Sequence, residues 1–231
     1  MTIPAIDWPA ASAALDAHGC AVLPQLLSLA ECAAIGALWD APDGFRKEVV
    51  MARHGYGSGT YRYFAYPLAE PVAALRAALY PPLAAIANRW AEALGQPARY
   101  PDTHDAYLAR CHAAGQTRPT PLLLRYGPGD WNALHQDVYG AELFPLQAVI
   151  LLSRPGADFT GGEFVLSEQR PRMQSRPEVV TLGAGDAVIF PVRERPAKGA
   201  RGWHRVQMRH GVSRLHGGRR NTLGIIFHDA A

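Results

Sequence analysis

The 231-residue sequence contains no apolar run as long as the roughly 18 residues that a membrane-spanning helix needs. The segment Met1 to Cys20 carries Asp7 and Asp16 but no Lys or Arg ahead of an apolar stretch, which is untypical of a secretory signal. No low-complexity tract, internal repeat or convincing linker divides the chain. We therefore expect a globular protein with no membrane insertion and no export.

Cysteine is also scarce. Cys20, Cys32 and Cys111 are odd in number, widely spaced and outside any CxxC pattern. This argues against a disulfide framework and against a structural zinc cluster. The sequence therefore predicts a reducing, cytoplasmic location.

Charge is modest and unevenly distributed. Hydrophobic residues make up 48% of the chain and charged residues 19%, so a substantial core can be buried. The net charge is +3, but the stretch from Arg170 to Arg220 has 12 basic and 3 acidic residues, a local +9 that leaves −6 for the rest. An anionic ligand or partner would bind the C-terminal half of the chain, unless the arginines form only a solvated face.

The first half is predicted to be helical. Ser28 and Glu31 have the spacing of a capping box, and apolar residues then recur at helical intervals as far as Trp39. A second pattern covers Val72 to Leu79, is expected to break at Pro81-Pro82, and resumes until Gly95. A further helix is expected near Asp105 to Ala114, with His104 and His112 as surface or capping residues. Between these helices, the glycine- and tyrosine-rich segment Gly55 to Tyr66 could be a lid or could cover a core edge.

After Gln116 the pattern changes to short apolar runs separated by Gly, Pro and Asp. Such runs have strand length, and seven or eight of them favour a double-sheet jelly roll. The runs are Leu122 to Tyr126, Leu146 to Leu152, Glu163 to Leu166, Val179 to Leu182, Ala187 to Pro191, Gly211 to Leu215 and Thr222 to His228. The predicted fold is mainly β with packing helices: a helical portion (1–116) on a double-stranded β-helix core (117–231), in one integrated domain.

The most informative residues for chemistry are His135 and Asp137, which follow the first of these strands. Residues two apart on a strand point to one face, so this imidazole and carboxylate can bind one metal ion. The pair alone is weak evidence, because any His near an Asp fits it. A third candidate is His210, which is followed by a glycine turn and by Arg220 at the start of the next strand. Two His and one carboxylate form the facial triad of non-haem Fe(II) sites.

These features resemble the Fe(II)/2-oxoglutarate-dependent oxygenases over about residues 117 to 229. The matching segments are Leu123 to Gly129, Gly161 to Phe164, Gly185 to Phe190 and the spacing of His210 and Arg220. More narrowly, the whole chain resembles a bacterial family of such oxygenases described as acting in oxidative demethylation of damaged DNA. The resemblance implies a double-stranded β-helix with Fe(II), 2-oxoglutarate as cosubstrate, O2, and ascorbate as a candidate reductant.

The resemblance also implies roles for individual residues. His135, Asp137 and His210 would bind iron, and Arg220 would pair with the distal carboxylate of 2-oxoglutarate. Tyr126 would be either a cosubstrate contact or a core aromatic residue.

Spacing alone leaves competitors for two of these roles. His204 is followed by Arg214 at the same offset of ten residues, but Arg214 falls inside a strand rather than at its start, so His210 and Arg220 are preferred. His216 has Ile226 at that offset, which counts against it. Arg219 would point to the opposite face from Arg220. Glu163 is expected to cap a hairpin and not to take part in catalysis.

The implied reaction is hydroxylation of a substrate C–H bond, coupled to conversion of 2-oxoglutarate to succinate and CO2. On an N-methyl group the hydroxymethyl product would release formaldehyde. The substrate could be an alkylated single-stranded nucleic acid, with a base stacked on Trp203 among the cations of Arg201 to Arg205. Alternatives are a protein (prolyl-type) or small-molecule hydroxylase, a zinc hydrolase with the same ligands, and a non-catalytic jelly-roll binding module.

Overall fold

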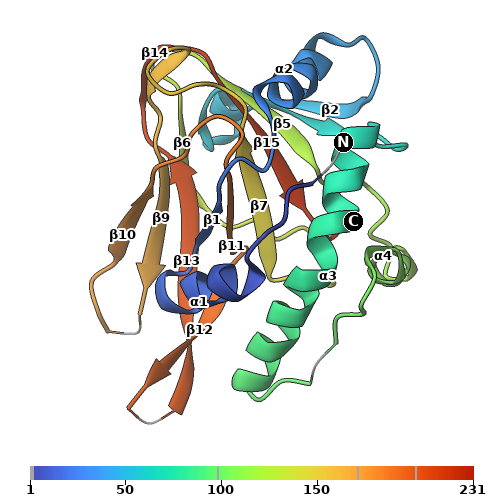
Figure 1. Ribbon diagram of the computed structural model, residues 1–231, viewed down its shortest axis with the longest axis vertical. Helices are drawn as coiled ribbons and strands as arrows, with labels where there is room; N and C mark the ends of the chain where they lie inside the picture. Colours follow the sequence, from blue (N-terminus) through green and yellow to red (C-terminus); the bar gives the residue numbers. More distant parts are fainter. Residues whose placement is uncertain (1–2, 98, 171, 201) are drawn as a thin grey trace.

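The computed structural model describes residues 3–97, 99–170, 172–200 and 202–231 and places them in antiparallel β-sheets with helices packed alongside (Figure 1). Within these residues, one sheet has seven strands in the order β1-β11-β7-β15-β5-β4-β2. The other has the order β10-β9-β13-β6-β3, with β12 paired to β13, and β14 and β8 form a two-stranded sheet. The predicted mainly β fold with flanking helices is confirmed.

The elements have these bounds: α1 Trp8–His18, β1 Ala21–Leu23, α2 Leu29–Ala37, β2 Phe45–Val50, β3 Gly57–Ser58, β4 Thr60–Phe64, α3 Glu70–Ala93, α4 His104–Ala113, β5 Leu122–Tyr126, β6 Trp131–His135, β7 Leu146–Leu151, β8 Phe159–Gly161, β9 Phe164–Gln169, β10 Arg176–Val180, β11 Ala187–Pro191, β12 Glu194–Gly199, β13 Gly202–Val212, β14 Leu215–Gly218 and β15 Arg220–Ile226. Short 3₁₀ helices cover Leu38–Asp40 and Met51–His54. No helix in the described ranges is both long and apolar enough to cross a membrane.

The capping box at the start of α2 is confirmed. The Ser28 hydroxyl accepts a hydrogen bond from the backbone N–H of Glu31 at 3.2 Å, and the Glu31 carboxylate accepts one from the N–H of Ser28 at 2.9 Å. Each group satisfies a donor that the first turn of a helix leaves unpaired.

The predicted helix break at Pro81-Pro82 is wrong, because α3 runs without interruption from Glu70 to Ala93. Pro81 lies on the exposed side of the helix, whereas Tyr80 and Leu83 are fully buried against the core. Burial of one continuous apolar face on both sides of the prolines outweighs the backbone hydrogen bonds that they remove.

The first half, predicted to be helical, also contributes strands that the sequence interpretation did not predict. Strand β1 pairs with β11 at one edge of the seven-stranded sheet, while β2 and β4 extend the other edge beyond β5. The tyrosine-rich segment predicted as a lid or an edge cover is strand β4 in its second half, hydrogen-bonded on both sides. We propose, on the strength of these pairings, that residues 1–116 and 117–231 form one integrated domain.

The predicted runs match β5, β7, β9, β10, β11 and β15 to within a few residues. Strands β6, β8 and β12 and most of β13, from residue 202 to 210, are missing from the prediction. In addition, the run predicted from Gly211 to Leu215 is divided: β13 ends at Val212, and Gly217 and Gly218 belong to β14.

Alternation along the strands determines which side chains face the space between the two large sheets. In β15, Leu223 and Ile225 pack outward beneath the helices, within the main hydrophobic cluster. Arg220 and Thr222 point the other way and line a cavity between the sheets. Arg219, just before the strand, is exposed, so the predicted opposite orientation of Arg219 and Arg220 is confirmed.

A buried ion pair attaches α3 and α4 to the C-terminal segment. Arg76 and Asp229 are 2.8 Å apart with side chains that are 1% and 0% exposed, and His112 lies 2.9 Å from the same carboxylate. His104, expected near the surface, is buried, with its Nε2 2.9 Å from the carbonyl oxygen of Phe227. Burial raises the pKa of Asp229, but the charge of Arg76 and the hydrogen bonds outweigh it, so the net pKa is below the usual range.

Asp229→Asn is expected to lower the free energy of unfolding at neutral pH by ~3–5 kcal/mol, because it leaves the Arg76 guanidinium buried without a counter-charge. A carboxylate with a depressed pKa stabilises the fold above its unfolded pKa, and the contribution is lost as the pH falls through the folded pKa. The variant should therefore also show a weaker loss of stability in acid. Denaturant unfolding at several pH values tests this, with the exposed Asp43→Asn as control; equal stability of the two variants would contradict it.

Candidate active site

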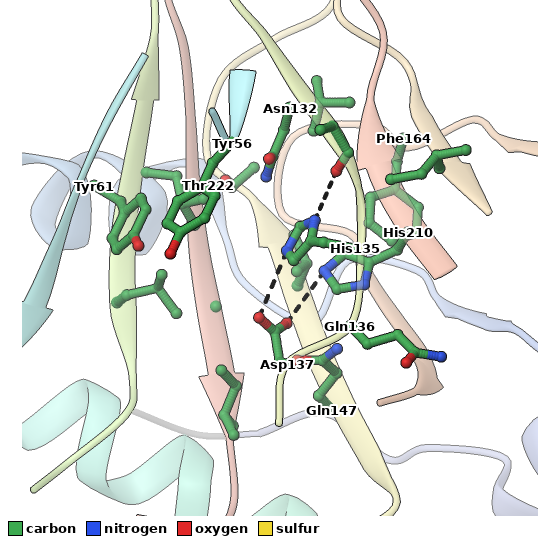
Figure 2. A pocket seen from close by; sticks show the side chains of 18 of the residues that line it. Tyr56, Tyr61, Asn132, His135, Gln136, Asp137, Gln147, Phe164, His210 and Thr222 are labelled. Carbon is green, nitrogen blue, oxygen red and sulfur yellow. Dashed lines mark hydrogen bonds and ion pairs between the residues drawn. The ribbon is translucent and has the colours of Figure 1, made fainter. Parts of the chain in front are cut away.

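A cavity of about 590 Å³ lies between the two large sheets. Inward-facing side chains of β4, β5, β7 and β15 form one wall, and β6 with the loop after it forms another. Figure 2 shows His135, Asp137 and His210 converging at this cavity.

The β5–β6 turn positions the first two of these residues. The Asp130 carboxylate accepts a hydrogen bond from the N–H of Gly127 at 2.8 Å, and Gly129 adopts a positive φ of 86°. After the turn, β6 runs as a strand of the smaller sheet and ends at His135. Asp137 follows two residues later, on the same side.

His210 enters the site from β13, directly opposite His135 in the β-ladder. The register shifts just beyond this pair, at Gly211, whose position would not hold a side chain: an added Cβ would lie 2.6 Å from the carbonyl oxygen of Asn132. Glycine therefore lets the two strands approach closely enough for the imidazoles to lie side by side, with ring centroids 4.1 Å apart.

The three side chains present a compact set of donor atoms, all within 4.8 Å of one another. The Asp137 carboxylate lies 3.2 Å from Nε2 of His210 and 3.5 Å from Nε2 of His135. Nδ1 of His135 lies 2.7 Å from the carbonyl oxygen of Ala133, the geometry in which Nδ1–H donates and Nε2 keeps its lone pair. The arrangement suits metal binding through both Nε2 atoms.

The electrostatics favour an ionised carboxylate at this position. Burial raises the pKa of Asp137, but the neighbouring His210 and His135 outweigh it and hold the pKa well below its usual range. Burial lowers the pKa of His210, and a protonated His135 would lower it further. Burial also lowers the pKa of His135, but the hydrogen bond and charge of Asp137 outweigh it, so the net pKa of His135 is raised. An anionic carboxylate beside a neutral imidazole is the form that binds a divalent ion.

Tyr139 forms a hydrogen bond with the Asp137 carboxylate, a contact that the sequence interpretation did not predict. Its hydroxyl donates to Asp137 at 2.6 Å and accepts from the hydroxyl of Tyr63 at 3.1 Å. Burial, followed by the charge of Asp137, raises the pKa of Tyr139 well above its usual value, so the hydroxyl remains a donor. The spacing of two residues from Asp137 is a signal that could have indicated it.

For a metal ion held by Asp137, Tyr139→Phe is expected to weaken binding about tenfold, because the carboxylate loses the hydrogen bond that orients it. Titration with Mn²⁺, a redox-stable probe, measures this affinity. Tyr100→Phe is the matched control, since that hydroxyl donates to the carbonyl of Leu143 instead. Equal affinities for the two variants would show that Tyr139 does not position the ligand.

Arg220 lies in the same cavity as a buried cation with no counter-ion in the described part of the chain. The residue is 2% exposed, and its Nε and Nη1 have no hydrogen-bond partner among the described residues. Burial lowers its pKa, yet arginine remains protonated in proteins. An unpaired buried guanidinium is costly, so this one is suited to receive an anionic ligand group.

Tyr126 and Gln147 also line the cavity. Tyr126 is the ladder partner of Arg220, with the guanidinium carbon 5.7 Å from the centre of its ring, and its hydroxyl accepts a hydrogen bond from Asn132 at 3.3 Å. Gln147 is 2% exposed, and its Nε2 has no partner among the described residues. A lone polar residue in the apolar run from 146 to 151 was a signal that the sequence interpretation missed.

The competing residues lie away from the converging set. His204 is in the β12–β13 hairpin opposite Ala197, six residues along β13 from His210. His216 is exposed on β14, and Arg214 is exposed between β13 and β14. Glu163 accepts a hydrogen bond from the hydroxyl of Ser213, which links the ends of β9 and β13, as expected of a hairpin cap.

The structure places Trp203, the residue on which a base was predicted to stack, away from the converging metal ligands. Trp203 is exposed, but it is seven residues before His210 on a single strand, about 23 Å away at about 3.3 Å per residue. Figure 1 shows the β12–β13 hairpin extending from the lower end of the molecule. Arg201, part of the same prediction, lies outside the described residues.

The basic stretch from Arg170 to Arg220 is also less available to a partner than its net charge suggested. Glu168 is buried among three arginines, with Arg170 at 2.7 Å, Arg176 at 3.6 Å and Arg195 in direct contact. Glu194 pairs with Arg193 and Arg205 in the same way. Five arginines of the stretch therefore form ion pairs in or beside the smaller sheet.

The donor set fits iron, and the cation fits the cosubstrate. Two imidazoles and one carboxylate leave three coordination positions open on non-haem Fe(II), and the orphaned Arg220 offers a planar fork for a carboxylate. Together, the fold and the site define the class of Fe(II)/2-oxoglutarate-dependent oxygenases.

Solved structures share the fold. The chain aligns over 97% of its length with all of a Pseudomonas putida prolyl-4-hydroxylase, at a TM-score of 0.52 and 17% identity. It aligns over its full length with 96% of an oxidoreductase of the 2OG-Fe(II) oxygenase family from Burkholderia pseudomallei, at a TM-score of 0.54 and 19% identity. These similarities support the jelly-roll architecture.

Sequence comparison identifies the particular family. Residues 59–230 match the family Oxygenase-NA, described as "Oxygenase, catalysing oxidative methylation of damaged DNA", and the chain belongs to this family. Uncharacterized protein MT2286 of Mycobacterium tuberculosis (strain CDC 1551 / Oshkosh) is 53% identical over 168 residues, covering 73% of this chain and 72% of the relative. The protein is thus an oxygenase, and neither a zinc hydrolase nor a non-catalytic module. The expected Fe(II), 2-oxoglutarate and O2 fit this membership and the His-Asp-His set.

Proposed function

We propose that this protein oxidatively removes methyl groups from alkylated bases of single-stranded nucleic acid. His135, Asp137 and His210 would hold Fe(II), and Arg220 would hold the distal carboxylate of 2-oxoglutarate, with Tyr126 beside it. The observation that carries the proposal is a buried, unpaired guanidinium in the same cavity as three converging metal donors. The family is described as acting on damaged DNA, which supplies the substrate class.

The chain's residues would each contribute to one step. Arg220 binds and orients the cosubstrate, and Tyr139 keeps the Asp137 carboxylate in place by hydrogen bonding. The apolar residues Leu122, Leu124 and Val149 exclude water from the cavity. When bound, Fe(II) supplies the activation of O2 that couples cosubstrate decarboxylation to C–H hydroxylation. Hydroxylation of an N-methyl group gives a hydroxymethyl amine, which releases formaldehyde.

The experiment measures formaldehyde and succinate together, from protein supplied with Fe(II), ascorbate, 2-oxoglutarate and an N-methylated single-stranded oligonucleotide. After subtraction of the succinate formed without substrate, we expect equal amounts of both products, and no formaldehyde from the unmethylated oligonucleotide. Succinate without formaldehyde from any methylated base would contradict demethylation and direct the search to peptide and small-molecule hydroxylation.

A further inference from the structure

A second cavity, of about 240 Å³, adjoins the catalytic one and carries cationic side chains. Four tyrosines border both cavities: Tyr56, Tyr61, Tyr63 and Tyr139. The remaining wall, which we name the basic groove, includes Arg46, Lys47, His54 and Arg118. Among the described residues that line this cavity, none is an Asp or a Glu.

A β-bulge explains how consecutive basic residues reach one groove. Strand β2 is the outermost strand of the seven-stranded sheet, and its pairing with β4 shifts between Phe45 and Lys47. Neighbouring side chains on a regular strand point to opposite faces, but the bulge lets Arg46 and Lys47 both line the cavity. Arg46 is also fixed in place: its Nε donates to the carbonyl of Pro119 at 2.8 Å, and its guanidinium lies 4.5 Å from the centre of the Tyr63 ring.

These cations are not neutralised within the described part of the protein. Arg46, Lys47 and Arg118 form no ion pair there, unlike the arginines around Glu168 and Glu194. Lys47 and Arg118 are also exposed. The unpaired positive charge thus lies beside the active site, in the part of the sequence outside Arg170 to Arg220, whose net charge is negative.

An exposed aromatic surface connects the groove with the catalytic cavity. Tyr56 is 51% exposed, and its ring stacks on that of His54 with centroids 5.4 Å apart and an interplanar angle of 22°. Aromatic faces beside a cationic track are the features by which proteins bind single-stranded nucleic acid without sequence preference.

We propose that the basic groove binds the phosphodiester backbone of a single-stranded nucleic acid. One base would then stack against Tyr56, and the adjacent base would enter the catalytic cavity. This inference rests on the proposed function for its substrate class. It assigns the electrostatic contact to Arg46, Lys47 and Arg118 instead of the arginine-rich C-terminal stretch.

The test measures binding of a fluorescently labelled, unmethylated single-stranded oligonucleotide by anisotropy over a range of salt concentrations. Lys47→Glu and Arg118→Glu should each weaken binding about tenfold at low salt and reduce the slope of log K against log salt by about 0.7 per lost phosphate contact. Tyr56→Ala should weaken it about tenfold through lost stacking. Lys198→Glu changes another exposed lysine, in the β12–β13 hairpin, and should remain within twofold of the wild type.

The outcomes distinguish a failure of the basic-groove assignment from a failure of the proposed demethylation reaction. Wild-type affinity in Lys47→Glu and Arg118→Glu, with thermal unfolding showing intact folds, would overturn the groove even if formaldehyde is released. A loss of oligonucleotide affinity in Lys198→Glu as large as that in Lys47→Glu would also overturn it and would place the bound nucleic acid at the β12–β13 hairpin. Groove-dependent binding without formaldehyde from any methylated base would support the groove and contradict the proposed reaction.

Discussion

His135→Ala, Asp137→Ala and His210→Ala are each expected to reduce succinate formation to background. Three ligands leave no spare protein donor in the set, so removing one leaves the metal weakly held and its open positions misplaced. Folding should be affected only modestly, because the three side chains border a cavity and do not fill the packed core. Succinate assays with saturating Fe(II), combined with thermal unfolding, measure both effects.

His204→Ala is the control for the assignment of the distal ligand. His204 had the same sequence offset to an arginine, but it lies in the β12–β13 hairpin. We expect the variant to retain wild-type turnover. An active His210→Ala together with an inactive His204→Ala would transfer the role to His204, and full activity in any of the three ligand variants would refute that residue's assignment.

Arg220→Ala is expected to raise the 2-oxoglutarate concentration needed for half-maximal turnover by roughly 30-fold or more. Losing one partner of a buried, hydrogen-bonded charge pair costs about 2–5 kcal/mol, and 1.4 kcal/mol is a tenfold change in affinity. Metal affinity should change little, because Arg220 is not one of the converging donors.

Arg219→Ala provides the matched comparison for Arg220. Arg219 is the preceding residue and is exposed, so we expect its variant to require the same 2-oxoglutarate concentration as the wild type. Titration of 2-oxoglutarate against both variants measures this. A larger effect in Arg219→Ala would contradict the assignment of the cosubstrate clamp.

Some of the site follows from strand periodicity alone. His135 and Asp137 are two residues apart, and Arg220 begins a strand whose alternation sends Leu223 outward. Each prediction needed only the local geometry of one extended segment. The convergence of β6 and β13 at Gly211 depends on a contact between distant segments, and the sequence indicated it only through the resemblance to known oxygenases.

Other features depend on contacts that no local pattern contains. Two prolines remain inside α3 because the helix is buried on both sides of them. The local charge of the Arg170 to Arg220 stretch did not reveal that buried Glu168 pairs with arginines from three different strands or loops. Conversely, the basic groove combines β2 with residue 118, which are far apart in the sequence, and both lie outside the Arg170 to Arg220 stretch, where the net charge is negative.

The most direct test of the account is turnover of 2-oxoglutarate by the purified protein with Fe(II) and ascorbate, without any other substrate. Slow release of succinate and CO2 in equal amounts is expected, to be abolished in His210→Ala and shifted to higher 2-oxoglutarate concentrations in Arg220→Ala. No succinate from an Fe(II)-loaded, folded wild-type protein, or equal rates in wild type and His210→Ala, would contradict it.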